Sequence, residues 1–501
     1  MGMIDSCIFV ILGGTGDLMR RKLLPALFYL ANNKLLPGKH AILGVARDPN
    51  LTDARFRRWA RKILADAGLS ARLGTRNWCD GCLHYQAVDE TSAADYQALA
   101  ARIASIEHGS GIHGNRVLYL ALPPGAFSAA IESLAEAGLN RSQGWTRLVI
   151  EKPFGRDLAS ARRLNALVHK HFDEKQVYRI DHYLAKETVQ NLLAFRFGNG
   201  LFESAWNRDH VKSVQITVAE ELGIEGRAGY YEQTGALRDI VQNHLTQLLT
   251  LIAMEVPAAL EADSIRFEKV KVLRSAAPIR HRDVVFGQYT RGRLNDRRVP
   301  GYRDEPGVAA ISATETFVAM RLQIENWRWQ GVPFYLRTGK RLPRRVTQIA
   351  IHFRSPPVAL FPSIVGRASR IPARTNALVI TLQPDEGFDL SFEVKTPGER
   401  FTLQTQRMTF RYAEAFGTLS AGYETLLLDV LQGDQTLFVH ADETEAAWRL
   451  YTPLLRKRSP PRFYPAGSWG PAAADRLVQL SGDAWENGSP GAGQASSSAN
   501  R

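Results

Sequence analysis

The sequence predicts two domains of different class: an N-terminal α/β domain with a doubly wound parallel sheet, and a C-terminal α+β domain with a large, mostly antiparallel sheet. The length of 501 residues exceeds what one hydrophobic core usually holds. Strand-like and helix-like stretches alternate in the first part, whereas period-two alternation of apolar and polar residues dominates after about residue 200. We place the domains at residues 1–180 and 181–482, followed by a disordered, Gly/Ser-rich tail at 483–501.

The N-terminal elements follow the order strand, helix, strand. Residues 8–14 are a continuous apolar run that ends in glycine, as a buried parallel strand does. Further strands are expected at 40–46, 116–124 and 146–155, and helices at 17–33 and 125–139. This repetition is typical of a parallel sheet with helices on both faces.

The C-terminal elements are mostly strands. Alternating stretches predict strands at 211–220, 315–329, 348–355, 377–384 and 388–396. An apolar stripe through Leu237, Val241 and Leu248 predicts a helix over 235–257, and residues 179–197 also read as a helix. The expected result is a large antiparallel sheet with one covered face.

The composition indicates an ordinary globular protein. The chain is 45% apolar and 23% charged, and it has no run of eighteen apolar residues; we expect its N-terminus to be a buried first strand and not a signal peptide. Three cysteines do not form a secreted disulfide framework, so we expect a cytoplasmic protein. The formal charge of +13 is spread along the whole chain, in groups such as "GRLNDRR" and "LPRRV", which favours anionic small molecules over nucleic acid as partners.

Two cysteines form a C-x-x-C pair, Cys79 and Cys82, with His84 just after them. A zinc site needs four ligands and this neighbourhood supplies three at most. A redox pair would be expected at a helix N-terminus after a strand, a context not clear here. We therefore expect no metal and no redox function.

A glycine turn follows the first strand. Gly13, Gly14 and Gly16 stand between that strand and the next helix, where glycine lets the backbone approach a pyrophosphate closely. The spacing is G-x-x-G, so a tight turn without a ligand remains an alternative. After the second strand comes Arg47, which can bind a 2′-phosphate and so favours NADP, with Lys22 as support. Asp48 keeps NAD open as a secondary cofactor.

Three other stretches carry candidate chemistry. Lys152 and Pro153, in "EKPFGRD", end a strand at the edge where ligands bind in such sheets, and the peptide bond between them is a candidate for the cis form. In a helix over 179–197, His182 and Lys186 would share a face suited to a dianion, Tyr183 would donate a third hydrogen bond, and Asp181 would face elsewhere. An amphipathic helix with ordinary salt bridges is the alternative.

The last candidates are scattered through the second half. His244 lies beside the apolar stripe of the 235–257 helix, and Asp239 on that helix faces elsewhere. Glu220 ends a strand, and Lys340 and Arg345 lie on a glycine-containing turn. Polar groups of these kinds near a dinucleotide-binding domain suggest a polyhydroxylated phosphate ester as substrate.

The longest motifs resemble those of the glucose-6-phosphate dehydrogenase family. They are "GGTGDLMRRKLLP", "EKPFGRDL", "RIDHYLAKETVQNLL", "GALRDIVQNHLTQLL", "NWRWQGVPFYLRTGKRLP" and "AGSWGP". They occur in order from about residue 8 to about residue 480. The resemblance implies a Rossmann-type N-terminal domain, an α+β C-terminal domain whose sheet forms the subunit contact, and NADP-dependent oxidation of glucose 6-phosphate, the first step of the oxidative pentose phosphate pathway.

The resemblance also implies a role for each matching residue. His244 matches the general base and Asp181 the carboxylate that orients it. Lys152 lies between substrate and cofactor. His182, Tyr183, Lys186 and Arg345 match residues that hold the sugar phosphate, and Glu220, Asp239 and Lys340 those that bond the sugar hydroxyls. Gly13, Gly14, Thr15, Gly16, Asp17, Leu18, Lys22 and Arg47 match the NADP site, with Tyr119 nearby. A homo-oligomer, dimer or tetramer, is implied, with neither nucleic acid nor membrane as partner.

Two departures and three alternatives remain. Ala185 replaces a more usual glycine, and Arg345 replaces the lysine of many bacterial relatives; neither change removes the charge contact with the phosphate.

The alternative functions are a catalytically silent NADP-binding regulator, a shorter sugar oxidoreductase of the glucose–fructose type, and a basic nucleic-acid-binding protein. The intact pair of His244 and Asp181 speaks against the first.

Overall fold

The computed structural model describes residues 4–69, 74–89, 92–358, 376–399, 403–417, 422–456 and 459–487. The chain divides into two compact units. Unit 1 contains Met1–Lys186, Pro257–Phe267 and Ser420–Glu445; unit 2 contains Glu187–Val256, Glu268–Leu419 and Ala446–Arg501. The first unit thus extends past residue 180, and the chain returns to it twice, which a linear division into two domains does not express.

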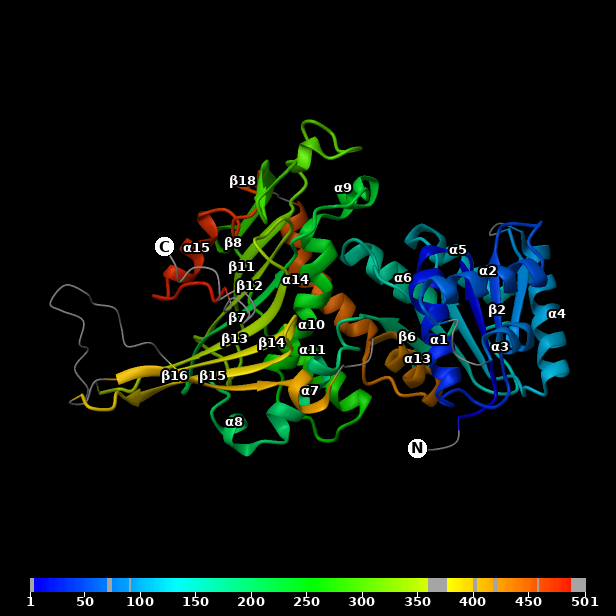
Figure 1. Cartoon of the computed structure of the whole chain (residues 1–501), viewed down its shortest axis with the longest axis horizontal. Coiled ribbons are helices and arrows are strands. Elements are labelled where there is room, and N and C mark those ends of the chain that lie inside the picture. The colour runs from blue at the N-terminus through cyan, green and yellow to red at the C-terminus, as the bar shows by residue number, and fades with distance from the viewer. Residues whose placement is uncertain are drawn as a thin grey trace. The chain divides into compact units, whose positions relative to one another are not determined.

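Unit 1 is built on a seven-stranded sheet with the order β17-β6-β5-β4-β1-β2-β3 (Figure 1). The strands are β1 (Cys7–Leu12), β2 (His40–Ala46), β3 (Leu83–Ala87), β4 (Arg116–Leu120), β5 (Thr146–Ile150), β6 (Val177–Ile180) and β17 (Phe438–Val439). Strands β1 to β6 pair in parallel, and β17 joins β6 in the antiparallel direction. The predicted doubly wound parallel sheet is confirmed.

Helices connect these parallel strands. They are η1 (Met19–Leu23), α1 (Leu24–Asn32), α2 (Asp53–Asp66), α3 (Thr75–Cys82), α4 (Ala93–Ser110), η2 (Pro124–Ala126), α5 (Phe127–Glu136), α6 (Leu158–His171), η3 (Glu174–Gln176) and α13 (Gly422–Gln432). Right-handed crossovers place α1 to α3 on one face of the sheet and α4 to α6 on the other, because the strand order reverses after β3. Helix α13 packs on α1.

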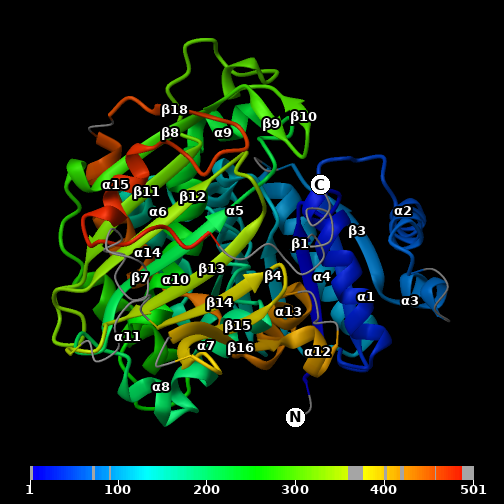
Figure 2. The ribbon, with the colours of Figure 1, turned by 60° about the vertical axis from the view of Figure 1, so that its left-hand side comes forward.

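Unit 2 is built on a nine-stranded sheet with the order β16-β15-β14-β13-β7-β12-β11-β8-β18 (Figure 2). The strands are β7 (Val211–Ala219), β8 (Val284–Thr290), β11 (Phe317–Gln323), β12 (Pro333–Gly339), β13 (Val346–Phe353), β14 (Ala377–Gln383), β15 (Gly387–Lys395), β16 (Leu403–Arg411) and β18 (Arg462–Pro465). All neighbours are antiparallel except two pairs, β7 with β12 and β8 with β18. The predicted, mostly antiparallel sheet is confirmed. A small hairpin, β9 (Gly292–Leu294) and β10 (Arg297–Val299), stands beside it.

Helices cover the nine-stranded sheet on both sides. They are α7 (Glu187–Phe197), α8 (Gly200–Ser204), α9 (Ala228–Ala236), η4 (Leu237–Leu245), α10 (Thr246–Ala253), η5 (His281–Asp283), η6 (Tyr302–Asp304), α12 (Tyr412–Phe416) and α15 (Ala473–Gln479). The helix η4 packs on β7, β11 and β12, and α15 packs on β11. Figure 1 shows α10, which continues η4, and α15 on opposite sides of the sheet. The helices α11 (Ala262–Arg274) and α14 (Ala441–Arg456) contain residues of both units.

The part of the chain that the structure describes contains no helix with the length and apolar character that a bilayer crossing requires. This finding rests on the helices bounded above. It agrees with the absence of a long apolar run from the sequence.

The structure corrects the helix expected over 179–197. Arg179 and Ile180 belong to β6, residues 181–186 form a turn, and α7 begins only at Glu187. The Asp181 carboxylate accepts a hydrogen bond from the Tyr183 backbone N–H at 3.0 Å, and the Leu184 N–H bonds to the Asp181 carbonyl at 2.9 Å. Local side-chain bonds of this kind compete with helix formation.

The disordered tail expected over 483–501 does not begin at residue 483. Asp483 accepts hydrogen bonds from Lys212 at 2.5 Å and Ser213 at 2.9 Å, and Trp485 is buried. The Trp485 ring lies 4.4 Å from the guanidinium of Arg337, which is itself wholly buried in β12. Residues 483–487 are therefore part of unit 2, while 488–501 lie outside the described residues.

The cysteine pair lies in a setting unsuited to redox chemistry. Cys79 and Cys82 are in the second half of α3, both buried, and burial raises the pKa of Cys79 to about 11. Burial also raises the pKa of Cys82, whose thiol donates to the Trp78 carbonyl at 3.0 Å. Cys7, in β1, is likewise buried, with its pKa raised to about 12. At neutral pH all three side chains are neutral thiols.

We predict that a chromogenic disulfide reagent at pH 8 modifies these cysteines slowly in the native protein, because only the thiolate attacks a disulfide. In denaturant all three thiols should react at once. A Cys79→Ala/Cys82→Ala variant serves as control and should release one thiol. Fast reaction of two thiols in the native state would contradict the inert environment, and only one reactive thiol after denaturation would reveal a disulfide.

Candidate active site

In unit 1 the candidate residues gather at one edge of the parallel sheet. The glycine turn follows β1, Arg47 follows β2, Lys152 follows β5 and Asp181 follows β6. Parallel strands all end at the same edge, which is where ligands bind in sheets of this topology. The fold therefore brings together four segments that are far apart in sequence.

A cavity of about 420 Å³ opens between the ends of β1, β2 and β4. Its volume falls in the range of small-molecule sites. It is lined by Leu12, Gly13, Thr15, Gly16, Val45, Ala46, Arg47, Asp48, Val88, Tyr96, Ala121, Leu122 and Pro123. Four of the predicted cofactor residues (Gly13, Thr15, Gly16 and Arg47) thus line one cavity, and Asp48 lies beside Arg47.

Glycine is required twice in this turn. Gly13 has a φ of +88°, and a Cβ there would overlap with the Ala121 carbonyl. Gly14 is packed on β2, where a Cβ would lie 2.6 Å from Gly44 Cα. This close backbone packing leaves space over the turn, the shape that a pyrophosphate group fits.

The remaining predicted cofactor residues lie around the turn. Leu18 precedes the helix η1, which contains Lys22. The Asp17 carboxylate is mostly exposed and accepts hydrogen bonds from Arg20 at 3.0 Å and Arg21 at 2.7 Å, and the bond from Arg20 lowers the pKa of Asp17. Asp17, Leu18 and Lys22 are not among the residues that line the cavity.

Tyr119 is placed differently from the other cofactor candidates. It is buried in β4, outside the cavity lining, and its phenol donates to Glu151 Oε1 at 2.6 Å. Tyr423, from α13, donates to the same oxygen at 3.3 Å. Tyr119 thus supports the end of β5, immediately before Lys152, and burial raises the pKa of Glu151 there. The peptide bond between Lys152 and Pro153 is cis.

The turn after β6 presents four polar side chains of the motif. Asp181 and Tyr183 are buried, while His182 and Lys186 are half-buried. The Lys186 ammonium lies 4.1 Å from the centre of the Tyr183 ring, and the rings of His182 and Tyr183 are 5.3 Å apart. The turn, not a helix face, brings His182 and Lys186 to the same tyrosine.

In unit 2 the candidate residues lie where β7 and β12 end. These strands are parallel neighbours in the register Ala219 with Gly339, so Glu220 and Lys340 follow side by side. The Lys340 ammonium, 2% exposed, contacts Glu220 Oε2 at 2.7 Å and lies 5.1 Å from the centre of the Tyr231 ring. A buried ammonium needs such a partner, and the partly exposed Glu220 carboxylate supplies it.

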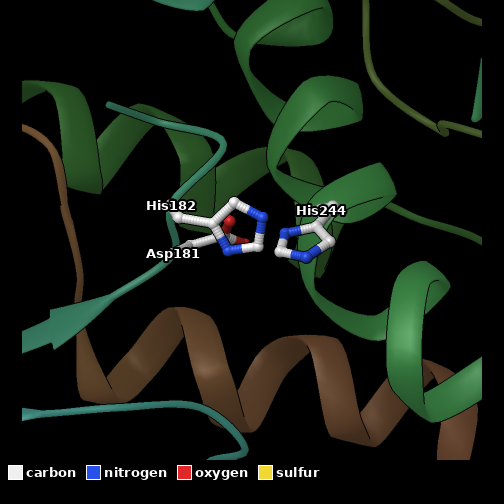
Figure 3. Close-up of side chains that lie close together, drawn as sticks. All are labelled: Asp181, His182 and His244. Carbon is white, nitrogen blue, oxygen red and sulfur yellow. The ribbon is translucent and has the colours of Figure 1, made fainter. Parts of the chain in front are cut away.

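His244 lies on η4, whereas Asp181 and His182 come from the turn after β6 (Figure 3). His244 is 1% exposed, and its backbone N–H donates to Asn243 Oδ1 at 2.7 Å. Asp239 precedes it by five residues and accepts a hydrogen bond from the Tyr230 phenol at 3.3 Å. The spacing of an α-helix predicts that Asp239 faces away from His244; η4 is instead a π-helix, whose i→i+5 hydrogen bonds reduce the angle between the two residues.

Arg345 lies on the turn between β12 and β13. Its guanidinium donates to Gln383 Oε1 at 3.2 Å, and the side chain stays accessible. An accessible guanidinium can bind a phosphate bidentately.

Sequence reasoning missed several residues that contact the candidate residues in unit 1 and in unit 2. Glu151 and Tyr423 support the Lys152 turn, and Tyr230 and Tyr231 contact Asp239 and Lys340. Burial first, and then the charge of Asp239, raise the pKa of both Tyr230 and Tyr231. The position of Glu151 directly before Lys152 was the one sequence signal available. Tyr423 lies too far along the chain to be linked to it by spacing.

Comparison with known proteins decides the family. Residues 10–191 match the family model of the glucose-6-phosphate dehydrogenase NAD binding domain, and residues 193–486 match that of the C-terminal domain. The chain belongs to the glucose-6-phosphate dehydrogenase family. The matched ranges cover nearly the whole chain, and the family reading of the motifs is confirmed.

Individual members of the glucose-6-phosphate dehydrogenase family are similar along their full length. The chain is 45% identical to glucose-6-phosphate 1-dehydrogenase of Aggregatibacter actinomycetemcomitans, over 96% of this chain and 97% of that protein. It is 44% identical to the enzyme of the same name from Treponema pallidum, over 97% and 96%.

Solved structures of the family have the same fold. A glucose-6-phosphate dehydrogenase in complex with its substrate glucose-6-phosphate superposes with a TM-score of 0.88 at 35% identity, covering 97% of this chain and all of that one. The enzyme from Mycobacterium avium gives 0.82 at 35%, covering 96% and 99%.

Proposed function

We propose that the protein is a glucose-6-phosphate 1-dehydrogenase that oxidises D-glucose 6-phosphate at C1 to 6-phospho-D-glucono-1,5-lactone with NADP⁺. Family membership over both domains carries this proposal. Each unit supplies part of the chemistry that the reaction needs. Unit 1 holds a cavity with a glycine turn and Arg47; unit 2 holds a paired carboxylate and ammonium, and a buried histidine on the helix η4 that packs on β7 and β12.

The proposed roles follow the two domains predicted from the sequence, so the phosphate-binding residues after β6 count with the C-terminal domain although they lie in unit 1. The N-terminal domain, residues 1–180, binds the cofactor, and the C-terminal domain, residues 181–482, binds the sugar. His182, Tyr183, Lys186 and Arg345 hold the phosphate with cationic and phenolic donors. Glu220, Asp239 and Lys340 bond the sugar hydroxyls, and Lys152 lies between sugar and nicotinamide. Because Lys340 and Glu220 are already paired, the hydroxyl site is formed before substrate arrives.

His244 acts as the general base. It removes the proton of the C1 hydroxyl of the cyclic sugar while the hydride leaves C1, so the bond from C1 to the hydroxyl oxygen becomes a carbonyl and the existing pyranose ring becomes the ring of the lactone. Asp181 holds the reactive tautomer of His244 and stabilises the imidazolium that forms. Bound NADP⁺ supplies the acceptor for the hydride at C4 of its nicotinamide. A positioned general base contributes about 10²–10⁴-fold to such a step.

Location and assembly complete the proposal. We place the protein in the cytoplasm, since its three cysteines are free thiols. We propose a homo-oligomer that associates through β15 and β16, because residues of these strands stay partly exposed along their length. Within the described ranges, no contact favours the silent-regulator alternative.

We predict that His244→Asn lowers kcat by about 10²–10⁴-fold, because the C1 proton loses its acceptor. Calorimetric binding of glucose 6-phosphate should stay within a few-fold of wild type, since phosphate and hydroxyl contacts remain. His281→Asn, an exposed histidine of the same unit, is the control and should leave kcat unchanged. Near-normal turnover in His244→Asn would remove this residue from its role.

We predict that Arg47→Ser raises the KM for NADP⁺ by about tenfold or more while the KM for NAD⁺ changes little, because only NADP⁺ carries a 2′-phosphate for the guanidinium. The measurement is reduced-nicotinamide absorbance with glucose 6-phosphate, run in parallel with both cofactors. Equal changes in the two KM values would show that Arg47 does not read the 2′-phosphate. No signal from wild type with either cofactor would overturn the proposed activity itself.

A further inference from the structure

The start of η4 is held by a residue from outside the helix. The Ala236 N–H donates to the Glu315 carbonyl at 2.9 Å, and the Leu237 N–H donates to Glu315 Oε1 at 3.3 Å. The first N–H groups of a helix have no partner within the helix. Glu315, 2% exposed, supplies two of those partners from the segment just before β11.

The next residue, Thr316, holds the turn that carries Lys340. Its carbonyl accepts the Lys340 N–H at 2.9 Å. The Tyr464 phenol contacts Thr316 Oγ1 at 3.1 Å and donates to the Lys340 carbonyl at 2.7 Å. The adjacent residues Glu315 and Thr316 therefore fix the backbone at the start of η4 and at the turn of Lys340. These two elements carry the groups that the proposed function assigns to sugar binding.

Gly235 makes the contact with Glu315 possible. It has a φ of +64°, which breaks α9 just before η4 begins. A Cβ at Gly235 would overlap with the Glu315 carboxylate. Both the conformation and the space at this position therefore exclude other side chains.

The place where η4 begins decides where its side chains point. In an α-helix, two residues five apart are separated by about 140° around the axis, because each residue turns about 100°. In the π-helix η4, the i→i+5 hydrogen bonds reduce this angle, so Asp239 and His244 differ less in direction than they would in an α-helix. Holding the first N–H groups of η4 fixes that direction relative to Lys340.

We propose that Glu315 is a positioning residue for proton abstraction: it fixes the start of η4 and so aims His244 and Asp239 at the sugar held beside Lys340 and Glu220. This inference rests on the proposed function. A carboxylate at the N-terminus of a helix is also electrostatically favourable there, since that end carries a partial positive charge.

The test compares Glu315→Ala with Glu315→Gln. Loss of the side-chain acceptor should lower kcat about 10- to 100-fold in Glu315→Ala, because small displacements of catalytic groups have effects of this size. The KM for NADP⁺ should stay within about twofold, since the cofactor cavity is in unit 1. Glu315→Gln keeps a carbonyl oxygen for the Leu237 N–H and should recover most of kcat.

Asp283→Ala is the matched control. Asp283 is also a buried carboxylate of unit 2; it accepts a hydrogen bond from Arg321 of β11 at 2.8 Å and, among the described residues, bonds to neither η4 nor Lys340. It should lower the melting temperature but leave kcat within about twofold. Should Glu315→Ala fail to fold, Glu315→Asp, which keeps the charge without the reach, makes the same comparison.

Each outcome is decisive. A low kcat in Glu315→Ala or Glu315→Asp, recovery in Glu315→Gln and a normal kcat in Asp283→Ala support the positioning role. Wild-type kcat in the shortened variants, equal losses in Glu315→Ala and Asp283→Ala, or no recovery in Glu315→Gln overturns it while the proposed function stands. Wild-type protein that forms no NADPH from glucose 6-phosphate overturns the proposed function instead.

Discussion

The parallel pairing of β7 with β12 brings Glu220 and Lys340 together, and the proposed sugar-binding site depends on this constraint. In a sheet whose strands otherwise mostly alternate in direction, these two neighbours run the same way, in the register Ala219 with Gly339. Both strands therefore end at the same edge of the sheet, where the Glu220 N–H donates to the Gly339 carbonyl at 3.0 Å. An antiparallel neighbour would have sent Lys340 to the opposite edge, away from Glu220.

The same rule operates in unit 1 on a larger scale. Every strand from β1 to β6 runs in one direction, so the segments after them meet at one edge. In both units, parallel strands end at the same edge of the sheet, and this brings polar groups from distant parts of the chain together. In each unit, buried support fixes the segment that follows the strand: Glu151 with two phenols before Lys152, and Glu315 with Thr316 at η4 and Lys340.

Much of the fold could be predicted because it depends on local pattern. The apolar run before Gly13 and the alternating stretch of β14 identify their strands. Gly13 itself predicts a turn, because glycine readily adopts the positive φ found there. The motif at residues 181–186 was misread, because helical spacing of polar residues does not reveal that Asp181 bonds the Tyr183 N–H and stops the helix.

Other features could not be predicted because they depend on tertiary contacts. The π-helical form of η4 leaves no mark on residue spacing, so Asp239 and His244 were expected to face apart. Glu315 belongs to no motif, and its role exists only once β11 lies beside η4. The return of residues 420–445 to unit 1 is likewise a matter of packing, in which α13 covers α1.

The proposed function requires His244 and Asp181 to act as one catalytic pair. A double-mutant cycle on kcat with His244→Asn, Asp181→Asn and both together tests it most directly. Residues that act as a unit are strongly non-additive, so we predict that the double variant is about as slow as His244→Asn alone. Losses that multiply in the double variant would show two independent contributions and contradict the account.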